Sequence, residues 1–112
     1  MRQLAVLLIL SAILAITVAA QKKPAIVVSP ARVKSGETLL LTGSGFTQNK
    51  TAMSHLRKPN GAEYNPLRLR TNERGGIVHK IDSVMLDLGT FDVWVEDEAS
   101  NTVSNRVQFT VE

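Results

Sequence analysis

Trp94 is the only tryptophan of this 112-residue chain, and the residues around it alternate between apolar and polar types. Successive side chains of a strand point to opposite faces, so Phe91 and Val93 are predicted to face a core and Trp94 the outer side. An outer indole could stack on a sugar ring or anchor a protein partner. Alternatively, it lies flat across its sheet under an arginine, in a cation–π contact. The candidate binding residues are Trp94, Asp92, Arg57, Arg106 and Gln108.

If Trp94 is an open binding platform, Trp94→Ala should abolish binding and leave the melting temperature nearly unchanged, because a side chain that faces water contributes little to stability.

Three neighbouring acids, Glu96, Asp97 and Glu98, are the weak candidates for a metal site. Carboxylate oxygens are ligands that calcium prefers, but this spacing matches no EF-hand loop. Neither His55 nor His79 has the companion at i+4 that a helical zinc site uses. We therefore expect solvated acids, no bound metal and no cofactor.

The sequence contains the residue types of a serine–histidine–aspartate catalytic system in Ser54, His55 and Asp82, but it has no nucleophile-elbow motif that would position the serine. The glycines of segment 43–45 follow a strand and open no helix, so they do not form a phosphate-binding loop. No enzyme activity is expected. The basic residues are dispersed, and nucleic acid is not expected as a partner.

Charge is distributed unevenly along the chain. Residues 21–80 hold eleven lysines and arginines against three acids, whereas residues 81–112 hold Arg106 against seven acids. Opposite fields on two surfaces would favour head-to-tail contact between copies. Alternatively, folding interleaves the strands and mixes the charges.

The N-terminal residues have the pattern of a signal peptide. Arg2 precedes an apolar run, and small residues stand before Gln21, so residues 1–20 are predicted to be removed on export. The run 4–20 is also just long enough to span a bilayer, so an uncleaved anchor is the alternative. A chain without cysteine fits the bacterial periplasm, the cell surface or the extracellular space.

A linker, 21–24, is followed by short β-like runs separated by turn residues over 25–112. Alternation places Leu39 and Leu41 in the core together with Phe109. About seven strands at even spacing predict a single all-β, Ig-like antiparallel β-sandwich. The predicted strands are 26–28, 38–42, 51–57, 67–71, 76–81, 90–96 and 106–111.

Four segments resemble the bacterial Ig-like modules of the IPT/TIG type. Residues 26–30 resemble an opening strand that ends in Ser-Pro, and residues 33–46 resemble the signature G-x-T … hydrophobic-T-G-x-x-F. Residues 89–97 resemble the strand G-T-Y-x-V-x-V-x-D, and residues 104–111 resemble the closing strand. The resemblance implies a binding, spacer or surface-assembly domain without catalytic residues. Independently, Gly43 and Gly45 are expected to supply positive φ before Phe46 turns into the core as a plug.

These observations predict an exported recognition or adhesion module for a protein or glycan partner, with a second copy of the chain among the candidates. The first alternative is a structural subunit that assembles head to tail. The second is an accessory subunit of a membrane complex, which contacts the membrane only if residues 4–20 remain as an anchor.

Overall fold

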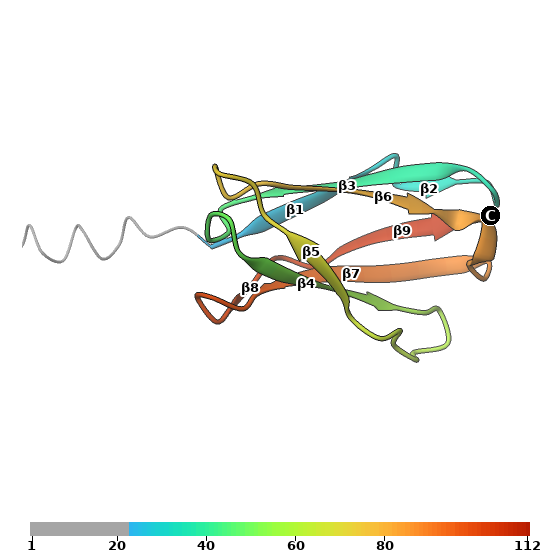
Figure 1. Cartoon of the computed structure of the whole chain (residues 1–112). Helices are drawn as coiled ribbons and strands as arrows, with labels where there is room; N and C mark the ends of the chain where they lie inside the picture. The colour runs from blue at the N-terminus through green and yellow to red at the C-terminus, as the bar shows by residue number, and fades with distance from the viewer. Residues whose placement is uncertain (1–22) are drawn as a thin grey trace, which may run out of the picture.

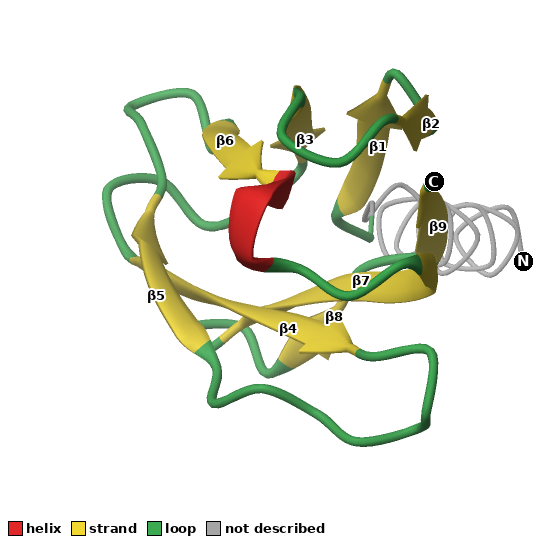
Figure 2. Ribbon diagram, turned by 90° about the vertical axis from the view of Figure 1, so that its right-hand side faces the viewer, coloured by secondary structure: helices red, strands yellow, loops and turns green. Residues whose placement is uncertain are grey.

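The computed structural model describes residues 23–112, so the predicted signal peptide and the first two linker residues lie outside the described part. Two β-sheets face each other as the layers of a sandwich (Figure 1 and Figure 2). The all-β, Ig-like fold predicted from the sequence is confirmed. Among residues 23–112, no helix is long and apolar enough to cross a membrane.

The small sheet has three antiparallel strands in the order β1-β3-β6. They span Ala25–Ser29, Thr38–Ser44 and Ile77–Asp82, respectively. A short 3-10 helix, η1 (Ser83–Met85), leads from β6 towards the other layer, and the Asp82 carboxylate caps it by accepting from Val84 N–H.

The large sheet has the order β2-β9-β7-β4-β5, and β8 pairs with β7. Its strands are β2 (Arg32–Val33), β4 (Thr51–Arg57), β5 (Leu67–Arg70), β7 (Gly89–Asp97), β8 (Thr102–Val103) and β9 (Val107–Val111). The seven predicted strands correspond to the longer strands of the two sheets. The two-residue strands β2 and β8 were not predicted, and β2 departs from the antiparallel pattern because it runs parallel to β9.

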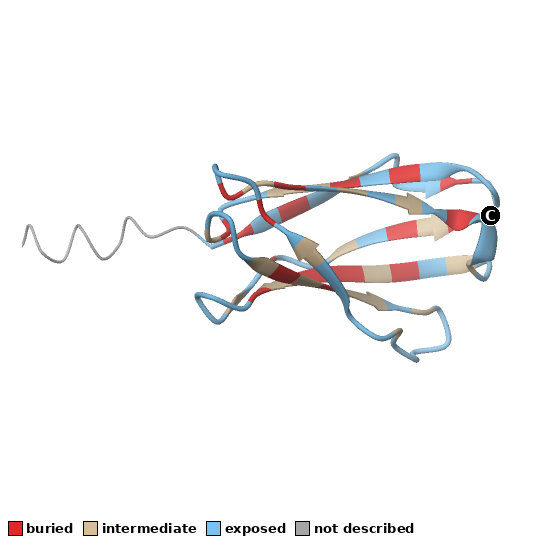
Figure 3. Cartoon of the chain, viewed as in Figure 1, coloured by how far each residue is buried: buried red, intermediate tan, exposed pale blue. Residues whose placement is uncertain are grey.

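The core lies between the sheets and follows the predicted alternation. Leu39 and Leu41 of the small sheet are buried, as are Phe91, Val93 and Val95 of β7. Figure 3 shows buried and exposed positions alternating along β3. Across β7 and β9, the rings of Phe91 and Phe109 stack with their centroids 5.0 Å apart. A register slip by one residue would expose this whole apolar set, so the burial requirement determines the register.

Phe46 closes one end of the core and is buried, as expected for a plug. The two glycines before it act differently from one another. Gly45 has φ +84°, whereas at Gly43 an added Cβ would lie only 2.9 Å from the side chains of Ile26 and Phe46. Gly43 is therefore needed for close packing rather than for positive φ, which corrects the sequence prediction.

Strand order mixes the charges that the linear sequence separates. The acid-rich strand β7 lies between β4 and β9 in the large sheet, and β9 lies next to β2. Strands from both halves of the chain are thus interleaved, as in the second of the two alternatives drawn from the sequence.

Candidate functional site: the outer face of the large sheet

The five candidate binding residues come together on one surface, which we call the Trp94 face: the outer side of β4, β7 and β9. Cross-strand pairing aligns His55 of β4 with Trp94 of β7. One row away, Arg57 pairs with Asp92, which pairs with Gln108 of β9. Arg106 is the residue before β9. The register of three adjacent strands thus positions all five side chains.

Trp94 is packed between side chains from the segments on either side of β7. The imidazole of His55 stacks on the indole, with ring centroids 5.2 Å apart and planes 1° from parallel. The guanidinium carbon of Arg106 lies over the indole, 3.9 Å from the ring centroid. Only 9% of Trp94 is exposed. Of the two interpretations drawn from the sequence, the structure therefore supports the one in which an arginine covers the indole, and not the open platform.

The acids of the Trp94 face have polar neighbours on the same face. His55 Nε2 lies 3.6 Å from Glu96 Oε1, and Gln108 Nε2 donates to Asp92 Oδ1 at 2.8 Å. Arg57 and Arg106 are exposed. The most accessible charges among the five candidate residues are therefore positive.

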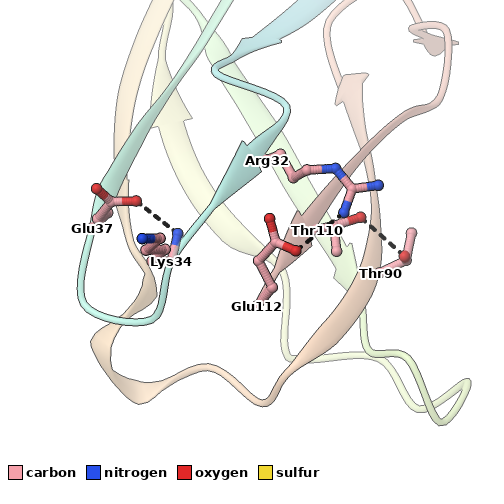
Figure 4. Close-up of polar contacts among 6 residues, drawn as sticks. All are labelled: Arg32, Lys34, Glu37, Thr90, Thr110 and Glu112. Atoms are coloured by element: carbon pink, nitrogen blue, oxygen red, sulfur yellow. Dashed lines mark hydrogen bonds and ion pairs between the residues drawn. The ribbon is translucent and has the colours of Figure 1, made fainter.

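Polar side chains extend the Trp94 face towards the end of the sheet where β7 begins and β9 ends (Figure 4). The hydroxyls of Thr90 and Thr110 are 3.0 Å apart across β7 and β9. Beside them Arg32 of β2 donates to the Glu112 carboxylate at 3.3 Å. Both side chains of this ion pair are more than half exposed, so the pair contributes little to stability.

The three candidate metal ligands point in different directions. Glu96 is on the Trp94 face, Asp97 is buried with 1% exposure, and Glu98 is exposed in the following turn. Among residues 23–112, no group of three or more potential ligands could hold a metal ion. Strand alternation separates neighbouring acids in this way.

Asp97 instead holds two loops together. Its Oδ2 accepts from the backbone N–H and the hydroxyl of Thr47 and from the hydroxyl of Ser100, each at 2.8 Å. Burial by itself raises the pKa of Asp97. Hydrogen bonds from Ser100, Thr47 and the backbone N–H of Ala99 more than offset that effect, so the pKa lies below its usual 3.8.

A cavity of about 120 Å³ between the sheets was not predicted from the sequence. Ser54 and His79 line it together with apolar side chains such as Leu56 and Ile81. Burial lowers the pKa of His79 from its usual 6.5. Ser54 faces this cavity whereas His55 lies on the outer side, so these neighbours do not form a nucleophile–base pair.

Comparison with protein families gave no match, and no curated protein matches the chain. Similar solved structures include the CARDB domain of a protein from Pyrococcus furiosus, crystallised in complex with di-metal ions. The two chains are 12% identical, the match covers 80% of this chain and 88% of that one, and the TM-score is 0.45. A similarity of this degree says nothing about ligands or activity of this chain.

Proposed function

We propose that this protein is an exported, non-catalytic recognition module that binds a protein partner through the Trp94 face. The observation that carries the proposal is the row His55–Trp94–Arg106, in which an exposed guanidinium lies over a nearly buried indole. An arginine positioned before binding loses less side-chain entropy when it binds. Arginine and tryptophan are also enriched among the residues that dominate binding energies.

The charges of the face favour a partner that presents carboxylates. Arg57 and Arg106 are exposed, while Asp92 is engaged by Gln108 and Glu96 lies beside His55. Guanidinium groups bind carboxylates with two parallel hydrogen bonds. A sugar stacked on the indole is less well supported, because His55 and Arg106 already contact the ring.

Affinity capture from the envelope of the exporting cell tests the proposal. The experiment compares the wild-type protein with Arg106→Ala and with the matched control Lys80→Ala. Each variant loses one positive charge, and Lys80 lies in the other sheet, away from the Trp94 face. We expect the captured protein to be lost with Arg106→Ala and retained with Lys80→Ala. Equal capture by all three proteins would refute the proposed site.

Export is a separate part of the proposal, supported by the charge, apolar run and small residues of segment 1–20. Mass spectrometry of the mature protein tests it directly. Gln21 as the first residue means release, whereas an intact N-terminus favours the membrane-anchored alternative.

We also infer a distant kinship with the IPT/TIG modules. What supports it is the order of the four motif segments between residues 26 and 111. The head-to-tail structural subunit loses its main support, because interleaved strands mix the charges on which it was based.

A further inference from the structure

The cavity between the sheets opens at one side of the sandwich. Figure 2 shows β5 of the large sheet and β6 of the small sheet at the same side of the domain, in different layers. Each is the last strand of its sheet. Among the lining residues, Ser54 and Val93 are buried, whereas Asn65 and Leu67 are exposed. The buried pair therefore forms the floor of the cavity and the exposed pair its rim, so a molecule can enter from solvent.

The lining of the cavity is apolar and polar but carries no carboxylate, ammonium or guanidinium group within the described part of the chain. The lining residues are Ser54, Leu56, Tyr64, Asn65, Leu67, His79, Ile81 and Val93. Burial lowers the pKa of His79, which keeps its imidazole neutral near pH 7. An ion in this cavity would lose its hydration without gaining an opposite charge, which is costly. The lining therefore favours an uncharged ligand.

Two polar side chains face each other's sheet across the cavity. Ser54 comes from β4, is only 8% exposed, and has no hydrogen-bond partner for its hydroxyl among residues 23–112. In that part of the chain, Asp97 Oδ1 is the one unpartnered side-chain atom that is closed off from solvent, so the Ser54 hydroxyl remains accessible from the cavity. His79 comes from β6 of the other sheet. A serine hydroxyl and a neutral imidazole can each donate and accept, so together they suit one ligand hydroxyl.

The volume of the cavity limits the ligand to the size of about one ring. The cavity measures about 120 Å³, below the range of about 300–1,000 Å³ that is usual for drug-sized ligands. It is close in size to an engineered apolar cavity of about 150 Å³ that binds benzene. A buried water needs about two to four polar partners, which the apolar side chains of the lining do not offer. An apolar group that displaces poorly ordered water from this part gains affinity.

We propose that the cavity binds a small uncharged ligand of the phenol class, which has one aromatic ring and one hydroxyl. The ring contacts the apolar side chains, and the hydroxyl donates to or accepts from Ser54 and His79. A ring loses less internal freedom on binding than a flexible chain of the same size. Tyr64 offers it an aromatic neighbour, and Lys58 Nζ lies 4.6 Å from the centroid of the Tyr64 ring. This site is independent of the Trp94 face, because Ser54 lies on the inner side of β4 and His55 on the outer side.

An NMR titration of the purified protein with phenol tests the proposal, with toluene as the matched probe. Toluene has the same ring but carries a methyl group in place of the hydroxyl. We expect saturable chemical-shift changes at Ser54, Ile81 and the His79 ring. The dissociation constant for phenol should be about 1 mM, since the ligand has few atoms. Leu56→Phe, which places additional ring atoms in the cavity, should abolish binding of both probes.

Ser54→Ala distinguishes the assigned hydrogen bond from apolar packing alone. Loss of one hydrogen bond should raise the dissociation constant of phenol about threefold to tenfold, whereas that of toluene should not rise. The control Ser29→Ala makes the same change at an exposed position of β1 and should alter neither constant. Near-ultraviolet circular dichroism verifies that each variant is folded.

Three results would overturn the proposal. Absence of saturation with either probe would mean that the cavity holds water only. Chemical-shift changes confined to residues away from the cavity would place the binding elsewhere. Equal effects of Ser54→Ala on phenol and toluene would mean that the Ser54 hydroxyl does not recognise the ligand.

Discussion

Replacing Trp94 by alanine should destabilise the domain substantially, because the indole is covered and not the open platform that was one of the two alternatives drawn from the sequence. A tryptophan buries about 150–250 Å² on folding, and this one is only 9% exposed. At about 25 cal/mol per Å², the lost burial sets an upper limit of about 4–6 kcal/mol. The covering side chains His55 and Arg106 are long or mobile enough to collapse into the gap. We therefore expect a loss of about 2–3 kcal/mol in the free energy of unfolding.

A double-mutant cycle separates packing from the arginine contact. Arg106→Ala removes an exposed cation that lies 3.9 Å from the ring centroid, and should cost about 0.5–1 kcal/mol. If most of that cost is the contact itself, Arg106→Ala should cost almost nothing in the Trp94→Ala background. Urea denaturation of the four proteins measures these differences, provided that the m-value stays constant.

The control is Gln108→Ala, an exposed residue of the same face, which should change the free energy of unfolding by less than about 0.5 kcal/mol. A loss below about 0.5 kcal/mol for Trp94→Ala would refute the reasoning, because it would mean that the indole is not packed as described. The open platform, the other alternative drawn from the sequence, would then be the better interpretation.

Three further predictions concern the contributions of Asp97, His79 and Asn105 to the stability of the domain. Asp97→Asn should cost about 1–3 kcal/mol in the free energy of unfolding, because a carboxylate that accepts hydrogen bonds from Thr47 and Ser100 is lost. Since the pKa of Asp97 is lowered on folding, the carboxylate stabilises the domain fully above pH 3.8, and this stabilisation is lost as the pH falls through the lower pKa of the folded state. The free energy of unfolding of the variant, measured against pH, should therefore change less in this acid range. The pKa of His79 is also lowered, so the wild-type protein should lose stability as the pH falls below 6.5, and His79→Gln should remove that part of the pH dependence in denaturant titrations. Asn105 Oδ1 accepts from Ile26 N–H at 2.8 Å, and Asn105 Nδ2 donates to the Ile26 carbonyl at 3.1 Å. Asn105→Ala leaves both backbone groups without these partners and should cost about 1–3 kcal/mol in thermal or urea unfolding, whereas Gln48→Ala, at an exposed position, should cost little. Equal effects of the two variants would mean that these two hydrogen bonds do not stabilise the domain.

The alternation of side chains made much of the fold predictable. Phe91, Val93 and Val95 had to share one face, and a single burial requirement then determined the register of β7. β4 was predicted with the bounds that it has, Thr51–Arg57. β2 and β8 carry only two residues each, which is too short for any period to show. Their existence depends on β9 and β7 as templates, which is information about tertiary structure.

The candidate site could be predicted in its membership but not in its packing. Strand periodicity is enough to place Trp94 on the outer side of β7. Whether an outer indole is open or covered depends on which side chains the neighbouring strands bring beside it. That is decided by the register of β4 against β7, which aligns His55 with Trp94, and by the position of Arg106 just before β9. The cavity beside Ser54 and His79 was missed for the same reason, since it is lined by residues distant in sequence.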